Sequence, residues 1–332
     1  MTVKITIIGT GQIGASIGMA LGAQKDLFLR IGHDKDLKIA NRAKDLGAVD
    51  KVEFNLYSAV ADSAIIILAL PLDQIRETLQ LIAQDLTEDV VIIDTAPVKG
   101  EVFKWVKELL PPLRYYVGLV PVINPVYLDT SGSGVESAHA DLFKDGMFAI
   151  LSTSDVPVEA LKLATDLTHL LGAEHIFIDP VELDSMMSGV HILPQLIAAA
   201  MLNTSVDQPG WRDARKLTGH PYAAITAAIG QPGEATALSS QALSTQEHLL
   251  RRMDAILEYL YEMRQQIASG EAEKLQQDLE RAGLAREKWL RERTAANWAG
   301  NETVPLVEMP TAKQVFTRMF TFGGGRKPKP PK

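Results

Sequence analysis

Three glycines near the start of the chain have the spacing of a phosphate-binding turn. Gly9, Gly11 and Gly14 form the pattern G-x-G-x-x-G between a β-branched run, residues 3–8, and a helical pattern. In such a turn the first glycine permits a tight bend, the second lets the backbone approach a pyrophosphate, and the third lets helix and strand pack closely. The N-terminus of the helix then faces the phosphate charge. The sequence therefore predicts a dinucleotide site lined by Gly9, Gly11, Gln12, Ile13 and Gly14.

A carboxylate follows at the distance expected for ribose recognition. Asp34 stands 20 residues after the third glycine, at the end of a second strand pattern. It can accept hydrogen bonds from both ribose hydroxyls of NAD, and its charge repels the 2′-phosphate of NADP, so we favour NAD, with NADP as the alternative. Lys35 and Lys38 could partly offset that repulsion, and Asp34 could instead be a turn residue. Leu70 and Pro71 end a third strand pattern at the same edge of the sheet, where backbone can pass over the dinucleotide, although Pro71 could simply end the strand.

Alternating strands and helices position these residues. Short, β-branched and continuously apolar runs are typical of strands buried on both faces of a parallel sheet, and the amphipathic stretches between them are long enough for crossover helices. The pattern predicts an α/β, Rossmann-like doubly wound sheet over residues 1–179. Its expected strands are residues 3–8, 29–34, 64–70, 90–94, 115–120, 147–151 and 174–178, and its expected helices include residues 37–46, 74–86 and 158–171.

From Pro180 onward the pattern is helical. Strand alternation is absent, and we expect an all-α domain over residues 180–300, followed by an extension, residues 301–332, with a disordered tail. One helix is apolar over much of its circumference and must be buried on several sides. We expect this helix to lie in a homodimer interface. The expected helices are residues 182–205, 222–229, 235–268 and 271–297.

Composition excludes several function classes. The chain has 332 residues and no cysteine, which excludes disulfides, thiolate metal sites and a cysteine nucleophile, and we expect no other metal site. Lys+Arg 33 against Asp+Glu 41 gives a net charge of -8, so no general field attracts nucleic acid or anionic lipid. The longest apolar run of the first half, residues 64–70, is far shorter than the ~20 residues of a membrane span. Without an export signal pattern, we expect a cytoplasmic protein with a small-molecule partner, and neither nucleic acid nor membrane as a partner.

Further motifs resemble those of the prephenate and arogenate dehydrogenases, enzymes of tyrosine biosynthesis with a Rossmann domain and a helical dimerisation domain. A D-x-x-S-V-K signature is matched by residues 94–99, and an H-P-M-x-G loop by residues 124–128. A D-x-x-x-A-x-x-S-H-L-P-H helix is matched by residues 184–195, and a G-F-R-D-x-T-R-I-A segment by residues 210–218. The resemblance covers roughly the first two thirds of the chain. It implies that hydride leaves a ring carbon bearing a hydroxyl group while carbon dioxide departs.

Several residues of the family pattern are replaced. The loop histidine that the resemblance places on the substrate hydroxyl is Asn124, which can hydrogen-bond but cannot take up a proton. The family serine is Pro97, and the arginine that grips a carboxylate is Lys216, which keeps the charge without the bidentate fork. His191 precedes a family histidine position by one residue, so on a uniform helix its ring points about 100° away; a substrate role and a partly buried structural histidine are both open. Lys99 could hold a substrate anion or be an ordinary loop lysine. The candidate catalytic residues are His191, Asn124, Lys99 and Lys216.

Three functions remain open from the sequence. The first is an NAD-dependent dehydrogenase resembling the prephenate and arogenate enzymes, with a diverged pocket for a small, anionic, prephenate-like substrate and weak or absent turnover of prephenate. The second is a dehydrogenase of a different small carboxylate. The third is a non-catalytic dinucleotide-binding protein, because the side chains expected to do proton chemistry are replaced. Restoring histidine at Asn124 is expected to raise activity if the pocket still holds a prephenate-like ring.

Overall fold

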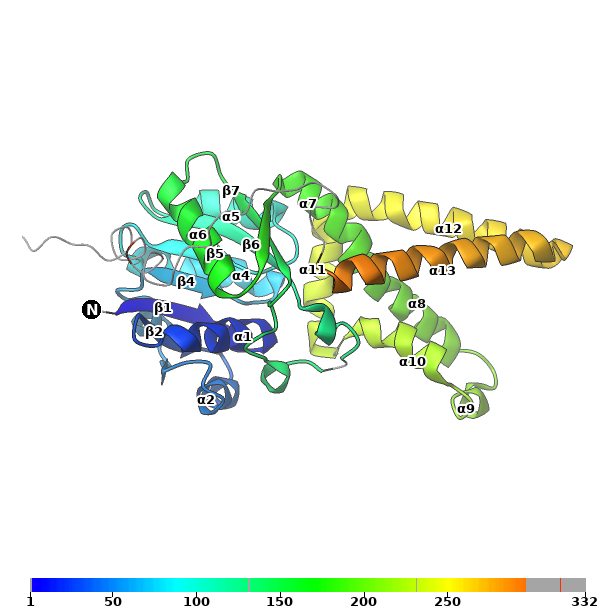
Figure 1. Cartoon of the computed structure of the whole chain (residues 1–332), viewed down its shortest axis with the longest axis horizontal. Helices are drawn as coiled ribbons and strands as arrows, with labels where there is room; N and C mark the ends of the chain where they lie inside the picture. The colour runs from blue at the N-terminus through cyan, green and yellow to red at the C-terminus, as the bar shows by residue number, and fades with distance from the viewer. Residues whose placement is uncertain (1, 131, 231, 297–316, 318–332) are drawn as a thin grey trace, which may run out of the picture. The chain divides into compact units, whose positions relative to one another are not determined.

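The computed structural model describes residues 2–130, 132–230, 232–296 and 317 (Figure 1). The chain divides into two compact units, one that extends to Pro180 and one that begins at Val181. The predicted extension, residues 301–332, lies outside the described residues except for Thr317.

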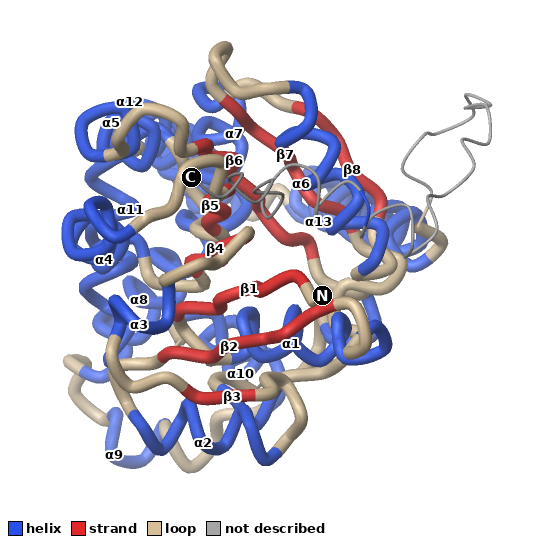
Figure 2. Tube along the Cα trace, turned by 90° about the vertical axis from the view of Figure 1, so that its left-hand side faces the viewer, coloured by secondary structure: helices blue, strands red, loops and turns tan. Residues whose placement is uncertain are grey.

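An eight-stranded sheet forms the centre of the first unit, with the strand order β3-β2-β1-β4-β5-β6-β7-β8 (Figure 2). Neighbouring strands are parallel except β6 and β7, which are antiparallel. The predicted α/β, Rossmann-like sheet is therefore confirmed. The strands are β1 (Val3–Ile8), β2 (Phe28–His33), β3 (Lys51–Val52), β4 (Ile65–Leu68), β5 (Val91–Asp94), β6 (Tyr115–Val122), β7 (Met147–Ser152) and β8 (Glu174–Phe177).

Two features of the sheet differ from the prediction. The two-residue strand β3 was not predicted, because a run this short has no detectable periodicity. The direction of β7 also differs, since the strand patterns are typical of a parallel sheet and β7 runs antiparallel to β6. A parallel pair needs a crossover that covers a sheet face, usually a helix, but among its described residues the β6–β7 connection contains only two short 3₁₀ turns, Pro125–Tyr127 and Val135–Ser137. The chain therefore returns antiparallel to β6.

Helices cover both faces of the sheet. Helices α1 and α6 lie on one side of the strands, and α3, α4 and α5 lie on the other (Figure 2). On the first side Ile17 and Leu21 of α1 and Leu163 and Leu167 of α6 join one buried cluster with the sheet. Burial on both faces explains why the strands are continuously apolar. The helices are α1 (Gln12–Leu21), α2 (Leu37–Asp45), α3 (Leu56–Val60), α4 (Leu72–Ile82), α5 (Gly100–Leu109) and α6 (Val158–Leu170).

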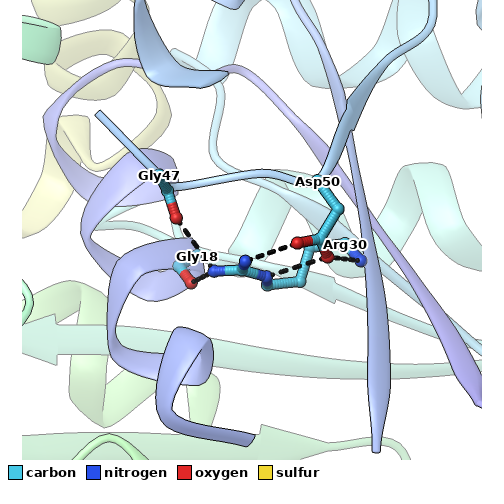
Figure 3. Close-up of polar contacts among 4 residues, drawn as sticks. All are labelled: Gly18, Arg30, Gly47 and Asp50. Atoms are coloured by element: carbon cyan, nitrogen blue, oxygen red, sulfur yellow. Dashed lines mark hydrogen bonds and ion pairs between the residues drawn. The ribbon is translucent and has the colours of Figure 1, made fainter. Parts of the chain in front are cut away.

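A buried arginine joins β2 to the first helix (Figure 3). Arg30 binds both carboxylate oxygens of Asp50, at 2.6 and 3.1 Å, and donates to the backbone oxygens of Gly18 and Gly47 at 2.7 and 3.0 Å. Burial alone raises the pKa of the Asp50 carboxyl, but the hydrogen bonds and the charge of Arg30 outweigh burial, so the net pKa is lowered. The pair holds α1 in place against β2 and the loop that precedes β3.

The second unit is helical, as predicted. Helices α12 and α13 lie side by side (Figure 1). The helix expected over residues 235–268 is interrupted at Thr245, whose backbone leaves helical geometry. The helix expected over residues 182–205 contains a π-helical turn, Ser188–Ile192. The helices are α7 (Pro180–Met187), α8 (Leu193–Val206), α9 (Trp211–Ala214), α10 (His220–Thr226), α11 (Ala235–Ser244), α12 (Gln246–Ser269) and α13 (Ala272–Thr294).

The run formed by α7, the π-helical turn and α8 is apolar but mostly uncovered. By length and composition alone, Pro180–Val206 could cross a membrane, which is weak evidence, and 22% of its most apolar window is buried. Val190 is 74% exposed, and Met186 and Ile197 are 46% and 37% exposed. The expectation that this helix is buried on several sides is therefore not met within one chain.

Candidate dinucleotide and substrate site

The glycine-rich turn connects β1 to α1 as predicted. Gly9 has a φ of 87°, and a Cβ atom at Gly9 would collide with the backbone oxygen of Ala69. A Cβ atom at Gly14 would collide with the backbone oxygen of Gly9, so both positions require glycine. A Cβ atom at Gly11 would meet nothing within 4 Å, which leaves open space where a pyrophosphate would approach. The turn thus fits a dinucleotide at the N-terminus of α1.

The other predicted residues near the turn have different environments. The Gln12 side chain donates to the backbone oxygen of Ser137 at 3.1 Å, and Ile13 packs against the core. Leu70 is half-buried after β4, and the exposed Pro71 immediately precedes α4. Pro71 therefore ends the strand region and begins the helix.

Asp34 is held by the turn itself. Its Oδ2 atom accepts hydrogen bonds from the Thr10 backbone N–H at 2.8 Å and from the Thr10 hydroxyl at 3.2 Å. Its Oδ1 atom accepts from the backbone N–H of Asp36 at 3.0 Å. Asp34 therefore shapes the turn after β2, as one interpretation held, and also lies directly against the glycine-rich turn. A carboxylate oxygen can accept more than one hydrogen bond, so Oδ1 keeps capacity for a ribose hydroxyl.

The basic side chains near Asp34 have partners or lie in solvent. The Lys35 ammonium donates to the side-chain oxygen of Gln74 at 3.2 Å, and the Lys38 side chain is exposed. Arg42 on α2 makes a two-pronged contact with Glu136, with N–O distances of 2.7 and 3.0 Å. This contact raises the pKa of Arg42 and lowers that of Glu136. The charge of Arg42 is therefore already matched by a carboxylate.

Lys99 is buried in an ion pair. Both Lys99 and Asp94 are 0% exposed, and the ammonium lies 2.6 Å from Oδ1 of Asp94. The same oxygen accepts from the backbone N–H of Ala96 at 2.9 Å, and the other oxygen accepts from the hydroxyl of Tyr116 on β6. Lys99 therefore fixes the loop after β5, and its charge faces Asp94 inside the protein.

Asn124 shapes the loop that follows β6. Its Oδ1 atom accepts from the backbone N–H of Val126 at 3.1 Å, and its Nδ2 atom donates to the backbone oxygen of Asp141 at 3.2 Å. The residue is 6% exposed. Both polar atoms of the side chain are therefore engaged with the loop itself.

The same loop carries a polar cluster that sequence reasoning missed. The Tyr127 hydroxyl donates to Oδ1 of Asp141 at 2.6 Å, and the ring of His139 stacks on the Tyr127 ring with centroids 4.4 Å apart and planes 14° apart. These residues are up to 14 positions apart, and none occupies a family motif position with assigned chemistry. Only the position of Tyr127 in the loop after β6 could have drawn attention to them.

His191 and Lys216 belong to the second unit. His191 is half-buried within the π-helical turn, and burial lowers the pKa of its imidazole. Because a π-helical turn alters the angular phase of a helix, the offset of about 100° calculated for a uniform helix does not apply to His191. The Lys216 ammonium pairs with Asp213 at 2.7 Å, and its side chain is 63% exposed.

One edge of the sheet brings several predicted residues together. Strands β2, β1, β4, β5 and β6 are adjacent and parallel, so their carboxyl ends lie at one edge. Such an edge is where open α/β sheets bind ligands. Within the described residues, no group of three or more His, Asp or Glu side chains could hold a metal ion. The residues that follow these strands at the edge, or end them, are Asp34, Gly9, Leu70, Asp94 and Asn124.

Comparisons with known proteins find a nucleotide-binding domain in the first unit and relatives among dehydrogenases. Residues 19–177 match the family described as prephenate dehydrogenase, nucleotide-binding domain. The chain is 27% identical over 283 residues to a prephenate dehydrogenase of Lactococcus lactis, covering 82% of this chain and 73% of that protein. It is 26% identical over 199 residues to a cyclohexadienyl dehydrogenase of Zymomonas mobilis, covering 60% of this chain and 66% of that protein.

A solved structure shows the same fold. It is a prephenate dehydrogenase from A. aeolicus in complex with hydroxyphenyl propionate and NAD+, with a TM-score of 0.75 and 21% sequence identity. The likeness covers 87% of this chain and 98% of that one. The family match covers most of the first unit, and the similarity to the Lactococcus lactis prephenate dehydrogenase extends over 283 residues, so the chain is similar to prephenate dehydrogenases.

Proposed function

We propose that the protein is an NAD-dependent dehydrogenase of a small anionic ring substrate of the prephenate or arogenate type. The observation that supports the proposal is the contact between Asp34 and Thr10, because a carboxylate directly against the glycine-rich turn can accept hydrogen bonds from a ribose. When bound, the nicotinamide cofactor supplies the hydride acceptor. The chain's part is to hold the pyrophosphate at the turn and to orient the ribose through Asp34.

Preference for NAD is supported by the charges around Asp34. A 2′-phosphate would meet the negative charge of Asp34, while the guanidinium of Arg42 on α2 is bound to Glu136. The Lys35 ammonium is turned toward Gln74. Because binding of NADP would require some of these contacts to break, the arrangement favours NAD.

A diverged substrate pocket is supported by the environments of the replaced residues. Asn124 is engaged with its own loop, and Lys99 is buried against Asp94. Lys216 has an exposed ion pair, which is worth only about 0 to 1 kcal/mol and can open to admit a substrate carboxylate. Lys216 is therefore the better candidate for binding a substrate anion, and His191 remains a candidate acid or base.

The second unit supports a homodimer. The apolar run from Pro180 to Val206 is largely uncovered in one chain, and burial against a second copy would remove this surface from water. We infer a cytoplasmic homodimer whose ligands are the cofactor and a small anion, without nucleic acid or membrane partners.

A turnover assay tests this function. NAD and NADP are each combined with prephenate and with arogenate, and reduced cofactor is followed by its absorbance. We expect faster turnover with NAD, and a product that has lost carbon dioxide. Nucleotide binding without turnover of either compound would favour the non-catalytic alternative, and turnover of a different small carboxylate would favour the second dehydrogenase alternative.

Matched variants test the role of Asp34. Asp34→Asn removes a charge against the glycine-rich turn, and Asp36→Asn removes a charge two residues further on while it retains a capping side chain. Loss of a charged hydrogen bond corresponds to about a ten- to hundredfold change in affinity. We expect Asp34→Asn to lower the ratio of NAD affinity to NADP affinity by that factor. Asp36→Asn should leave this ratio within about twofold of its value in the unmodified chain. An equal effect of both variants would contradict the assignment.

A further inference from the structure

We propose that Tyr127 and Asp141 together form the group that accepts the hydroxyl hydrogen of the substrate, a task that Asn124 cannot perform. The inference rests on the proposed function, because it assigns a proton route to that reaction. It concerns residues that no family motif assigns to chemistry.

The pair has the geometry of a directed hydrogen-bond relay. The Tyr127 hydroxyl donates to Oδ1 of Asp141 at 2.6 Å, which directs its hydrogen to the carboxylate. The lone pairs of the phenol oxygen remain available to accept another hydrogen bond. His139 stacks against the Tyr127 ring at 4.4 Å, which restricts its rotation. Tyr127 is half-buried, whereas Asp141 is exposed.

The loop that carries the pair is attached to the cofactor helix. The backbone N–H of His139 donates to the hydroxyl of Ser16 at 3.0 Å, and the Gln12 side chain donates to the backbone oxygen of Ser137 at 3.1 Å. Gln12 and Ser16 both lie on α1, the helix that begins after the glycine-rich turn. Tyr127 also follows the carboxyl end of β6, the edge at which an open sheet binds its ligands. The pair is therefore built into the cofactor end of the first unit.

Asn124 and the pair form one hydrogen-bonded assembly. Asn124 donates to the backbone oxygen of Asp141, and its backbone N–H donates to the oxygen of Leu142 at 2.6 Å. The turn that begins at Asn124 presents Tyr127 three residues later. In this chain Asn124 therefore acts as a positioning residue that holds Tyr127 and Asp141 together.

The protonation state of the pair suits acceptance. The hydrogen bond to Asp141 raises the pKa of the Tyr127 phenol, with smaller contributions from burial and the Asp141 charge. Tyr127 is therefore a neutral phenol near neutral pH, and its hydrogen is held by a carboxylate that can take it. General-base assistance of this kind contributes about 10² to 10⁴ in rate.

The proton balance closes within the reaction. As hydride leaves for the nicotinamide, the carbon that bears the hydroxyl becomes electron-poor, and its hydroxyl hydrogen becomes more acidic. Tyr127 accepts this hydrogen while its own hydrogen passes to Asp141. The leaving carboxylate departs as carbon dioxide and leaves its bonding electron pair in the ring, which becomes aromatic. The hydrogen then returns through Tyr127 to the phenolic oxygen of the product, so the pair ends as it began.

The first test compares Tyr127→Phe, Asp141→Asn and the control Tyr57→Phe, which alters an exposed tyrosine on α3. We expect each of the first two variants to lower kcat by about a hundredfold and to remove the acidic limb of the pH profile, while the KM for NAD stays unchanged. The control should retain full turnover. A kcat within about twofold of the unmodified chain and an unaltered pH profile for both Tyr127→Phe and Asp141→Asn would overturn the proposal.

A binding test separates this inference from the proposed function. Calorimetry on the NAD-saturated protein compares hydroxyphenyl propionate with phenyl propionate, which lacks the hydroxyl. We expect about tenfold tighter binding of the hydroxylated compound, and loss of that difference in Tyr127→Phe. If neither prephenate nor arogenate turns over but this pattern holds, the proposed function fails while the pair's recognition of a ring hydroxyl stands. Equal affinity for the two compounds in the unmodified protein would overturn the inference.

Discussion

Replacing Lys99 by methionine tests how strongly the loop after β5 depends on its buried ion pair. Methionine retains much of the apolar stem but removes the ammonium that lies 2.6 Å from Asp94 and 3.2 Å from its backbone oxygen. The Asp94 carboxylate would then remain buried, with hydrogen bonds from Ala96 and Tyr116 but no opposing charge at Lys99. Removal of one partner from a buried pair costs about 3 to 5 kcal/mol.

The chain contains a matched control for this change. Lys104 and Glu101 form an ion pair on α5 with an N–O distance of 2.7 Å, close to that of the buried pair, but the Lys104 side chain is 72% exposed. If the N–O distance alone determined how much an ion pair contributes to the free energy of unfolding, Lys104→Met would destabilise the chain as much as Lys99→Met. Because solvent screens the exposed pair, we expect Lys104→Met to cost about 1 kcal/mol or less.

Denaturant-dependent hydrogen exchange of the β5 amides reports the free energy of unfolding of the first unit, and circular dichroism follows the whole chain. We also expect the double variant Asp94→Asn with Lys99→Met to be more stable than Lys99→Met alone, because it removes the uncompensated charge. A cost for Lys99→Met within about 1 kcal/mol of that for Lys104→Met would refute the argument from burial.

Three further predictions concern pH, assembly and cofactor choice. Burial, and then the charge of His169, lower the pKa of His175 in the folded protein, so below the usual imidazole pKa of 6.5 the unfolded chain binds more protons than the folded chain. The free energy of unfolding is therefore retained above pH 6.5 and falls as the pH drops toward the folded pKa of His175. His175→Gln should reduce this loss in denaturation measured at about pH 8, 6 and 5. Light scattering at micromolar concentration should show a dimer, and Val190→Glu should shift it toward monomer; a chain that is monomeric before mutation would contradict the interface. Glu136→Gln should free Arg42 and tighten NADP binding about threefold or more, whereas an unchanged Kd would show that this guanidinium does not influence cofactor choice.

The part of the fold that could be predicted follows from local sequence patterns. The continuous apolar runs of β1, β4 and β5 predict burial on both faces, and these strands are buried in a sheet with helices on both sides. The direction of β7 could not be predicted, because it depends on whether the preceding loop crosses a sheet face. The π-helical turn at residues 188–192 was also unpredicted, since no periodicity marks one inserted residue.

The candidate site likewise contains residues that the sequence predicts and residues whose environment it does not predict. Gly9 and Gly14 could be identified because backbone collisions make any larger residue incompatible with the turn. The burial of Lys99 could not be, because its environment includes Tyr116, 22 residues beyond Asp94 on the neighbouring strand. The engagement of Asn124 likewise depends on Asp141, 17 residues away. Side chains that depend on distant partners therefore acquire their roles only through tertiary structure.

Asn124→His is the variant for which sequence and structure lead to different expectations. From the sequence, a histidine at this position restores a base on the substrate hydroxyl. In the structure, the Asn124 oxygen accepts from the backbone N–H of Val126, and an imidazole can replace it only if Nδ1 accepts that hydrogen bond. The other ring nitrogen then carries the hydrogen and becomes a donor, so it cannot accept the substrate proton.

We therefore expect Asn124→His to destabilise the chain by about 1 kcal/mol, through loss of the hydrogen bond to Asp141 and crowding at a buried position. Its kcat should stay within about tenfold of the unmodified chain, well below the 10² to 10⁴ of a general base. Denaturation midpoints and steady-state kinetics with prephenate and NAD measure both quantities. A hundredfold rise in kcat would mean that the loop reorganises around the new histidine, and that the hydrogen bonds of Asn124 do not constrain the chemistry of this position.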